Sequence, residues 1–515
     1  MRTGPQPGVM TMDSVVRRGA RRTPDKVVLS DSTASWTWRD FDEQVDRAAR
    51  ALIELGVGPG DRVAAAGYNS AEYFAVYYGA ARLGAILVPL NYLSAADEMR
   101  FVLGDAEPAV ILVEDEFREL ISGAAEAAVP GATLLDFNAA DTEWAQRTAA
   151  AENVGDELPP PDPESIHVVM YTSGTTGRPK GVCHTQRAHY VDGLSTALGF
   201  GLGPSDGYVV HAPSFHGASW DHAKLFLFCD GKVAITPRFE AESLMRETAA
   251  HGASVLFGVP AVLRLLLNHE SWGRYDLSCV RIVYFGGALG SLAILGEFAE
   301  ALGRSVDYVQ VYGLTEGGPW CTMSPPEMVD SKPKSIGKPL PAVEIDTVDP
   351  ETGEPVATGE VGELVMRGPT IMSGYWRNEE ATATTLRDGW LHTGDLAVRD
   401  AEGDYQIVDR LKDMIRSGGE NVYAAEVERV LLEHPEIAEA AVVGLPDERW
   451  DERVVGVVLR RPGATLEEEA LLEFCRGRLA RYKVPKQLEF VADFPRTGLG
   501  KIAKPELRTQ LLGED

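Results

Sequence analysis

The chain has 515 residues, too many for one hydrophobic core, so at least two domains are expected. Its 77 acidic residues against 49 basic ones give a net charge of −28, which argues against nonspecific binding to nucleic acid or to an anionic membrane. No apolar run has the length of a membrane span, because Arg82 interrupts the best one, from Tyr73 to Leu90.

Strand and helix patterns alternate along the N-terminal part of the chain. Strands are expected at 25–30, 61–66 and 85–90, and helices at 41–53, with Gly56 as a stop, and at 73–83. Such alternation is typical of an α/β design with largely parallel sheets.

A loop rich in glycine and hydroxyl side chains follows the apolar run Ile166–Met170, which is predicted to be a buried strand. Its glycines allow close backbone approach, so successive N–H groups can surround an anion, and Lys180 adds a mobile positive charge. The composition is suited to holding a polyphosphate. The residues we expect to bind it are Thr172, Ser173, Gly174, Thr175, Thr176, Gly177 and Lys180.

Two other interpretations fit this loop less well. An ordinary Ser/Thr/Gly surface turn is disfavoured by the buried strand before it and the Pro-Lys-Gly exit after it. A Walker-type P-loop needs four residues between its first glycine and a Gly-Lys-Ser/Thr, whereas Gly174 and Gly177 are separated by two.

Alternation resumes beyond the loop, with strands expected at 254–259, 280–285 and 306–311 and a helix opening at Pro260. Short runs broken by glycine, from about 341 to 375, suggest a small β-rich subdomain. After Asp409 the pattern changes to short strands and two helices, and we place a domain boundary at 409–412.

The loop resembles the phosphate-binding loop of the adenylate-forming superfamily, which comprises acyl-CoA synthetases, adenylation domains of peptide synthetases, and luciferases. Further segments match motifs of that superfamily in order and spacing, so the resemblance covers nearly the whole chain. These segments are Gly286–Leu289, Gln310–Glu316, Gly389–Asp395, Asp409–Ile415 with Gly418–Asn421, and Pro495–Ile502.

The resemblance implies a nucleotide site around Gln310–Glu316. Tyr312 is expected against adenine, Thr315 near the α-phosphate and Glu316 on Mg²⁺, an ion that usually takes one or two carboxylates. Taken alone, this run could equally be a strand end with a helix cap. The other implied nucleotide contacts are Gly287, Ala288, Gln310, Val311 and Gly313, with Thr176 as a second metal ligand.

The later motifs imply a ribose site and a hinge. Asp395 can accept two hydrogen bonds from the ribose diol, Arg410 contacts ribose, and Lys412 is the pivot. The resemblance places Gly418, Gly419 and Asn421 at the CoA channel. Without a functional role, the charged segment around 410–413 would be a turn exposed to solvent.

Lys501 follows Gly498 and Gly500 in the C-terminal motif, and the resemblance implies that it is catalytic. A lysine supplies a point charge that can stabilise the charge developing between a carboxylate and the α-phosphate. A lysine near a C-terminus is usually only solvated, and the surrounding motif is what favours the catalytic interpretation.

The acid is expected between the segment 212–220 and the glycine turns, including Gly286 and Gly287. Phe215 and His216 resemble the aromatic pair that borders the carboxylate, with His216 also among the catalytic residues. Trp220 is expected either to line an apolar tunnel or to pack in the core. The position after Phe215, an aspartate in amino-acid-activating relatives, is His216, which predicts an acid without an α-amino group.

We therefore predict an AMP-forming acyl-CoA synthetase that uses ATP, Mg²⁺ and CoA on a carboxylic acid. The expected fold is α/β: residues 1–409 form two mixed α/β subdomains and a small β-rich one, and residues 410–515 a small mobile α+β domain. The alternatives are an adenylation enzyme that loads a carrier protein and an acyl-nucleotide sensor without turnover. The identity of the acid and the oligomeric state, a homodimer included, stay open.

The five cysteines are odd in number and widely spaced, and no Cys-x-x-Cys occurs. The N-terminus also lacks the apolar core of a signal peptide. Both features predict reduced thiols in a cytoplasmic protein.

Overall fold

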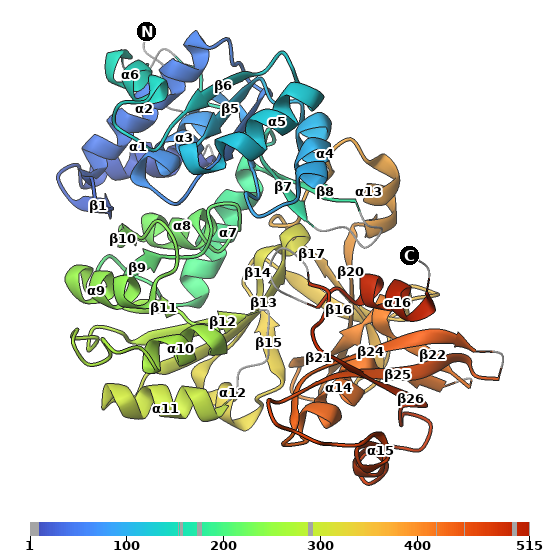
Figure 1. Ribbon diagram of the computed structural model, residues 1–515. Helices are drawn as coiled ribbons and strands as arrows, with labels where there is room; N and C mark the ends of the chain where they lie inside the picture. Colours follow the sequence, from blue (N-terminus) through green and yellow to red (C-terminus); the bar gives the residue numbers. More distant parts are fainter. Residues whose placement is uncertain are drawn as a thin grey trace. The chain divides into compact units, whose positions relative to one another are not determined.

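The computed structural model describes residues 10–152, 154, 158–172, 178–286, 292–418, 420–447, 449–496 and 502–513. The chain divides into two compact units, a larger one of Met1–Ile345 with Met366–Thr393 and a smaller one of Asp346–Val365 with Gly394–Asp515 (Figure 1). This confirms the predicted fold class of a large α/β part and a smaller C-terminal part. The hinge at 409–412 stays a prediction.

The first sheet of the larger unit contains the two strands, β7 and β8, that come directly before and after the predicted phosphate loop in the sequence (Figure 1). Its strand order is β18-β8-β7-β4-β3-β5-β6, and the pairs from β7 to β6 are parallel, while β8 and β18 are antiparallel to their neighbours. The strands are β3 (Arg62–Ala66), β4 (Ile86–Pro89), β5 (Val110–Val113), β6 (Thr133–Asp136), β7 (Ile166–Thr172), β8 (Lys180–Thr185) and β18 (Gly374–Tyr375).

The helices of this N-terminal region form where the sequence provides caps. Ser70 caps α3 and Thr37 opens a capping box at α2, which ends at Glu54, close to the expected Gly56. Arg82, which interrupts the apolar run, is fully buried and paired with Asp13, Asp42 and Asp46. The helices are α1 (Met12–Arg22), α2 (Trp38–Glu54), α3 (Ala71–Leu83), α4 (Ala96–Ala106), α5 (Arg118–Ala128) and α6 (Glu143–Ala150), with a 3₁₀ turn η1 (Asp115–Phe117).

The second sheet of the larger unit runs β15-β14-β13-β12-β11-β9-β10-β1-β2. The pairs from β13 to β1 are parallel, and the remaining pairs are antiparallel. The strands are β1 (Val27–Ser30), β2 (Ser35–Thr37), β9 (Gly207–Val210), β10 (Lys232–Ile235), β11 (Val255–Phe257), β12 (Ile282–Gly286), β13 (Asp307–Leu314), β14 (Gly318–Ser324) and β15 (Ser335–Pro339).

The two faces of this sheet bury different clusters. Tyr208 and Tyr284 belong to the largest core cluster together with Trp220, whereas Val209 and Val283, which adjoin these tyrosines in their strands, belong to a separate cluster. The helices here are α7 (Gln186–Gly199), α8 (Trp220–Phe228), α9 (Ala241–His251), α10 (Pro260–Leu267), α11 (Leu292–Leu302), α12 (Pro326–Ser331) and α13 (Glu379–Thr385). The predicted strands are thus confirmed to within a few residues.

The predicted β-rich segment contains β16 (Glu344–Val348) and β17 (Val361–Arg367), followed in the chain by β19 (Leu386–Arg387), β20 (Trp390–Arg399) and β21 (Tyr405–Arg410). In the smaller unit a further sheet runs β23-β22-β25-β24, with β26 on β25. Its strands are β22 (Ile415–Ser417), β23 (Glu420–Val422), β24 (Ile437–Asp447), β25 (Asp451–Arg460) and β26 (Gln487–Val491).

After Asp409 the described residues form three α-helices, so the expectation of two was wrong. They are α14 (Ala424–Leu432), α15 (Glu468–Arg476) and α16 (Lys504–Leu512). The extra helix begins at Lys504 with a proline in its first turn, and it buries only Leu507. Such a short helix with one buried apolar residue gives little periodic signal in the sequence.

No helix within the described ranges combines the length and the apolar character that crossing a bilayer requires.

Buried histidines make the stability of the larger unit depend on pH. Burial lowers the pKa of His167 to about 3 and those of His184 and His211 to about 4, and it also lowers the pKa of His189 and His222. The unfolded chain therefore takes up protons on these rings below about pH 6.5, where the folded chain does not.

We expect the free energy of unfolding to fall as the pH is lowered from 7 to 5. Between pH 7 and pH 5, each of the five histidines lowers the free energy of unfolding by roughly 2 kcal/mol. Burial raises the pKa of Glu72 to about 7 and that of Asp221 to about 6, so these two carboxyls act in the opposite direction, by roughly 4 kcal/mol together. Burial also raises the pKa of Asp46 and Asp192, which act in the same direction as these two. Chemical denaturation at pH 7, 6 and 5 measures the balance, and equal or greater stability at pH 5 would contradict it.

Candidate functional site

The phosphate loop is held at both ends by the hairpin of β7 and β8. Thr172 and Lys180 are antiparallel partners, so the segment between them leaves and re-enters the sheet at neighbouring positions. The predicted residues Ser173, Gly174, Thr175, Thr176 and Gly177 lie outside the described residues. The structure thus fixes where the loop begins and ends.

The Thr315–Glu316 turn follows β13 directly and forms a 3₁₀ turn, η2 (Thr315–Gly317). Two groups from residues 372–375 hold Glu316. The Met372 amide donates to its carbonyl oxygen over 2.8 Å, and the Tyr375 hydroxyl donates to its Oε1 over 2.9 Å. The predicted metal-binding carboxylate therefore has a fixed position before any ligand arrives.

His184 of β8 holds the same turn from the strand that leaves the phosphate loop. Its Nε2 lies 2.6 Å from the carbonyl oxygen of Thr315. Because a carbonyl only accepts, Nε2 carries the proton, and the pKa of about 4 caused by burial keeps the ring neutral near pH 7. His184 thereby connects β8 to the residue expected near the α-phosphate.

Glu316 fits a magnesium ion. Within the described residues its Oε2 has no protein partner, and the side chain is half-buried, so one oxygen is held and one is left for an ion. A hard cation such as Mg²⁺ prefers carboxylate oxygens and keeps several waters. Lys180 supplies the nearby positive charge, with its Nζ 5.0 Å from the centre of the Tyr375 ring.

The expected adenine side is formed by the ends of β12 and β13. Gly286 pairs with Val311, and a side chain at Gly286 would meet the Val311 carbonyl oxygen at 2.9 Å, so only glycine fits this close approach. Gln310 and Val311 are buried, while Tyr312 is half-buried and Gly313 is exposed. Gly287 and Ala288 lie outside the described residues.

The expected acid-binding segment, 212–220, is anchored by Asn69 in front of α3. Asn69 donates to the Ala212 carbonyl over 2.8 Å and accepts from the Ser219 hydroxyl over 2.7 Å, so it holds both ends of the segment. Phe215 is half-buried and His216 is exposed.

Trp220 is fully buried and belongs to the core. Its Nε1 donates to the Ser214 carbonyl over 2.9 Å, and its ring lies 4.8 Å from that of Tyr77. The sequence left two roles open for Trp220, packing in the core and lining an apolar tunnel. Its burial corresponds to core packing, and the tunnel-lining role remains a prediction.

Asp221 is part of a buried triad between α7 and α8. Lys224 pairs with Asp221 on its own helix and with Asp192 of α7, whose Oδ2 is 2.7 Å from Nζ. All three side chains are at most 1% exposed. Burial acts to lower the pKa of Lys224, but the two carboxylates raise it overall, so the lysine stays charged.

The two expected ribose residues lie side by side in the smaller unit. Asp395 of β20 and Arg410 of β21 are strand partners, and Arg410 Nε is 2.5 Å from Asp395 Oδ1. Asp395 is buried, whereas half of the Arg410 side chain is exposed. The pairing orients the carboxylate and still leaves the guanidinium able to reach a diol.

The segment after the ribose pair is tied to the sheet of the smaller unit. Lys412 lies in the 3₁₀ turn η3 (Leu411–Asp413). Gly418 has a φ of 65° and donates to the Trp450 carbonyl over 2.7 Å, and a side chain there would meet the Trp450 ring at 2.8 Å. Asn421 lies on β23, and the predicted residues Gly419 and Lys501 lie outside the described residues.

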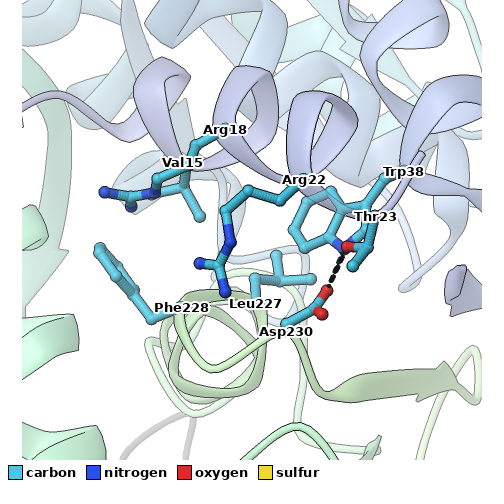
Figure 2. A pocket seen from close by; sticks show the side chains of 9 residues that line it. Val15, Arg18, Arg22, Thr23, Trp38, Leu227, Phe228 and Asp230 are labelled. Atoms are coloured by element: carbon cyan, nitrogen blue, oxygen red, sulfur yellow. Dashed lines mark hydrogen bonds between the residues drawn. The ribbon is translucent and has the colours of Figure 1, made fainter.

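A small cavity of about 10 Å³ lies elsewhere, between α1, α2 and the end of α8. Figure 2 shows Asp230 directed at Thr23 and Trp38, and both donate to its Oδ1, over 2.9 and 2.6 Å. The volume is that of one water molecule. None of the predicted site residues lines it, and we assign it no function.

The sequence did not point to Tyr375 or to His184, although both contact the predicted turn. Tyr375 is 59 residues from Glu316, and His184 is 131 residues from Thr315. The one signal in the sequence was that His184 belongs to the strand directly after the phosphate loop.

Known proteins similar to this chain match it over nearly its whole length. The sequence pattern of AMP-binding enzymes matches residues 16–376, and that of the AMP-binding enzyme C-terminal domain matches residues 426–501. The chain is 36% identical over 495 residues to a feruloyl-CoA synthase of Amycolatopsis sp, covering 95% of this chain and 97% of the relative. It is 34% identical over 522 residues to the fatty acid–[acyl-carrier-protein] ligase ScoC of Streptomyces coeruleorubidus, covering 99% and 98%.

A solved structure is similar over the same length. ATP-bound MatB from Rhodopseudomonas palustris gives a TM-score of 0.87 at 29% identity, covering 97% of this chain and 98% of that one.

Proposed function

The chain belongs to the family of AMP-binding enzymes, and from this premise we propose that it is an AMP-forming acyl-CoA synthetase. The observation that carries the proposal is the cluster in the larger unit. There Lys180 and Glu316 both contact Tyr375, and Thr315 is held by His184, directly beside the ends of the phosphate loop. A positive charge, a metal-binding carboxylate and a hydroxyl are the groups that an activated phosphate needs.

The proposed reaction has two steps. A carboxylate oxygen attacks the α-phosphorus of ATP, forming acyl-AMP and releasing pyrophosphate. The CoA thiol, losing its proton, then attacks the acyl carbonyl and releases AMP. Mg²⁺, when bound by Glu316 and Thr176, supplies positive charge beside the phosphates.

The chain's own residues orient the two substrates. We assign the β- and γ-phosphates to the loop 172–177 with Lys180, the adenine to Tyr312 with Gly287 and Ala288, and the ribose to Asp395 and Arg410. His216 and Phe215 border the carboxylate. Lys501 neutralises the charge that develops as the carboxylate approaches the α-phosphate.

We further propose that residues 410–515 turn about Lys412 between the two steps. Lys501 and the segment 418–421 lie in the same domain some eighty residues apart in sequence. One orientation would present Lys501 for adenylation and the other the glycine segment for CoA. The widely spaced free cysteines support a cytoplasmic location for this chemistry.

We expect the acid to lack an α-amino group. Asp221 is the acidic residue nearest in sequence to the acid-binding segment, and it is already paired with Lys224. An α-ammonium would therefore be buried without a partner, which is costly. Pyrophosphate exchange should occur with fatty, aryl or polycyclic acids and not with the twenty amino acids. Robust exchange with an amino acid, lost in Asp221→Ala, would instead support a peptide-synthetase-like enzyme.

One experiment tests both whether the protein turns over and whether CoA is the acceptor of the acyl group. Purified protein with ATP, Mg²⁺, CoA and an acid panel should release AMP and form a thioester. Exchange without CoA-dependent AMP release would support the carrier-protein alternative. ATP binding without either activity, across the whole panel, would support the sensor alternative.

A further inference from the structure

Tyr375 contacts two residues of the proposed phosphate site at once. Its hydroxyl donates to Glu316 Oε1 over 2.9 Å, and its ring centre lies 5.0 Å from Lys180 Nζ. The first contact is a hydrogen bond to a carboxylate, which is stronger than one between neutral groups. The second is a cation–π contact.

The backbone around Tyr375 holds this ring in place. β18 pairs with β8, so that Tyr375 lies opposite Val182, two residues beyond Lys180. The Tyr375 amide donates to the Thr382 hydroxyl of α13 over 2.8 Å, and the Met372 amide binds the Glu316 carbonyl. The backbone of Tyr375 is therefore held by the sheet and by α13, and its hydroxyl is held by Glu316.

The hydroxyl is a permanent donor. The Glu316 carboxylate accepts hydrogen bonds, so the phenol oxygen that lies 2.9 Å from its Oε1 is the donor. It binds Oε1 and leaves Oε2 to face an ion. Hydrogen bonds of this kind orient metal-binding carboxylates, and losing one typically weakens metal binding by 10- to 100-fold.

We propose that Tyr375 is a positioning residue that presents Glu316 to the metal and keeps the Lys180 ammonium beside the phosphate loop. This role rests on the proposed function. It assigns two separable contributions to one side chain: the hydroxyl acts through the metal, and the ring acts through the lysine.

Two substitutions separate these contributions. Tyr375→Phe keeps the ring and removes the hydroxyl, whereas Tyr375→Leu removes both. Titration calorimetry measures ATP binding with Mg²⁺ and with EDTA in place of Mg²⁺. We expect Tyr375→Phe to weaken Mg-ATP binding about tenfold and to leave metal-free ATP binding unchanged, and Tyr375→Leu to weaken both.

Two controls make the result specific. Tyr190→Phe removes another tyrosine hydroxyl, which accepts from Arg18 Nη1 over 2.7 Å, and should leave both affinities unchanged. In a Glu316→Gln background, which has no carboxylate to present, Tyr375→Phe should cost no further metal-dependent affinity. Thermal unfolding of each variant checks that it is folded.

An equal loss of affinity with and without Mg²⁺ in Tyr375→Phe, or no loss at all, would overturn the positioning role. The same loss in the Glu316→Gln background would do so too. These outcomes leave the proposed function intact, provided that the wild-type protein binds ATP more tightly with Mg²⁺. A wild-type protein that shows no such preference would contradict the metal-dependent function and this role with it.

Discussion

Replacing Lys501 by alanine should slow acyl-AMP formation by about 10²-fold or more, while thioester formation from supplied acyl-AMP continues. The lysine is expected to stabilise charge that develops only when the carboxylate attacks the α-phosphorus. The second step breaks the bond between the acyl carbon and the AMP oxygen, and in the proposed domain arrangement Lys501 has by then moved away. Pyrophosphate exchange reports the first step, and AMP release from synthetic acyl-AMP and CoA reports the second.

Another lysine of the C-terminal part of the chain provides the control for this experiment. Lys486 in the smaller unit donates to backbone carbonyls, among them that of Val484 over 2.9 Å, and has no proposed part in catalysis. Lys486→Ala should keep both rates. An equal loss of the two half-reactions in Lys501→Ala would contradict the division of labour between Lys501 and the glycine segment.

Replacing Lys224 by methionine should destabilise the larger unit by about 3–5 kcal/mol, because two carboxylates would be left buried without a cation. Asp192 and Asp221 flank this lysine, and burial raises the pKa of both. Denaturant unfolding measures the loss. Lys232→Met, at an exposed lysine of β10, should change the stability by no more than about 0.5 kcal/mol.

The origin of this loss can be tested by removing the charges together. A triple variant, Lys224→Met with Asp192→Asn and Asp221→Asn, should recover most of the lost stability, since it leaves no uncompensated buried charge. If Lys224→Met unfolds at the wild-type denaturant concentration, the triad is not a stabilising network. Failure of the triple variant to recover would assign the loss to packing instead.

The sequence predicted those parts of the fold that depend on local pattern. The strand before the phosphate loop, the helix that begins at Pro260 and the end of α2 near Gly56 follow from apolar periodicity, caps and turn residues. The third C-terminal helix was missed because a nine-residue helix with one buried apolar residue has almost no periodic signal.

The candidate site was predicted as a list of residues and not as an arrangement. Motif spacing identified Lys180, Glu316 and Asp395, but the pairing of Asp395 with Arg410 depends on strand register. The contact of Tyr375 with Glu316 depends on β18 joining the edge of a sheet formed much earlier in the chain. A single sequence contains no local signal for either contact.

Isotope transfer tests the central claim, the formation of acyl-AMP, most directly. If the carboxylate oxygen attacks the α-phosphorus, that oxygen leaves with AMP when CoA takes the acyl group. An active acid labelled with ¹⁸O in its carboxyl group should therefore yield AMP that carries one ¹⁸O atom, together with a CoA thioester in equal amount. Unlabelled AMP, or label found in inorganic phosphate beside ADP, would contradict the account.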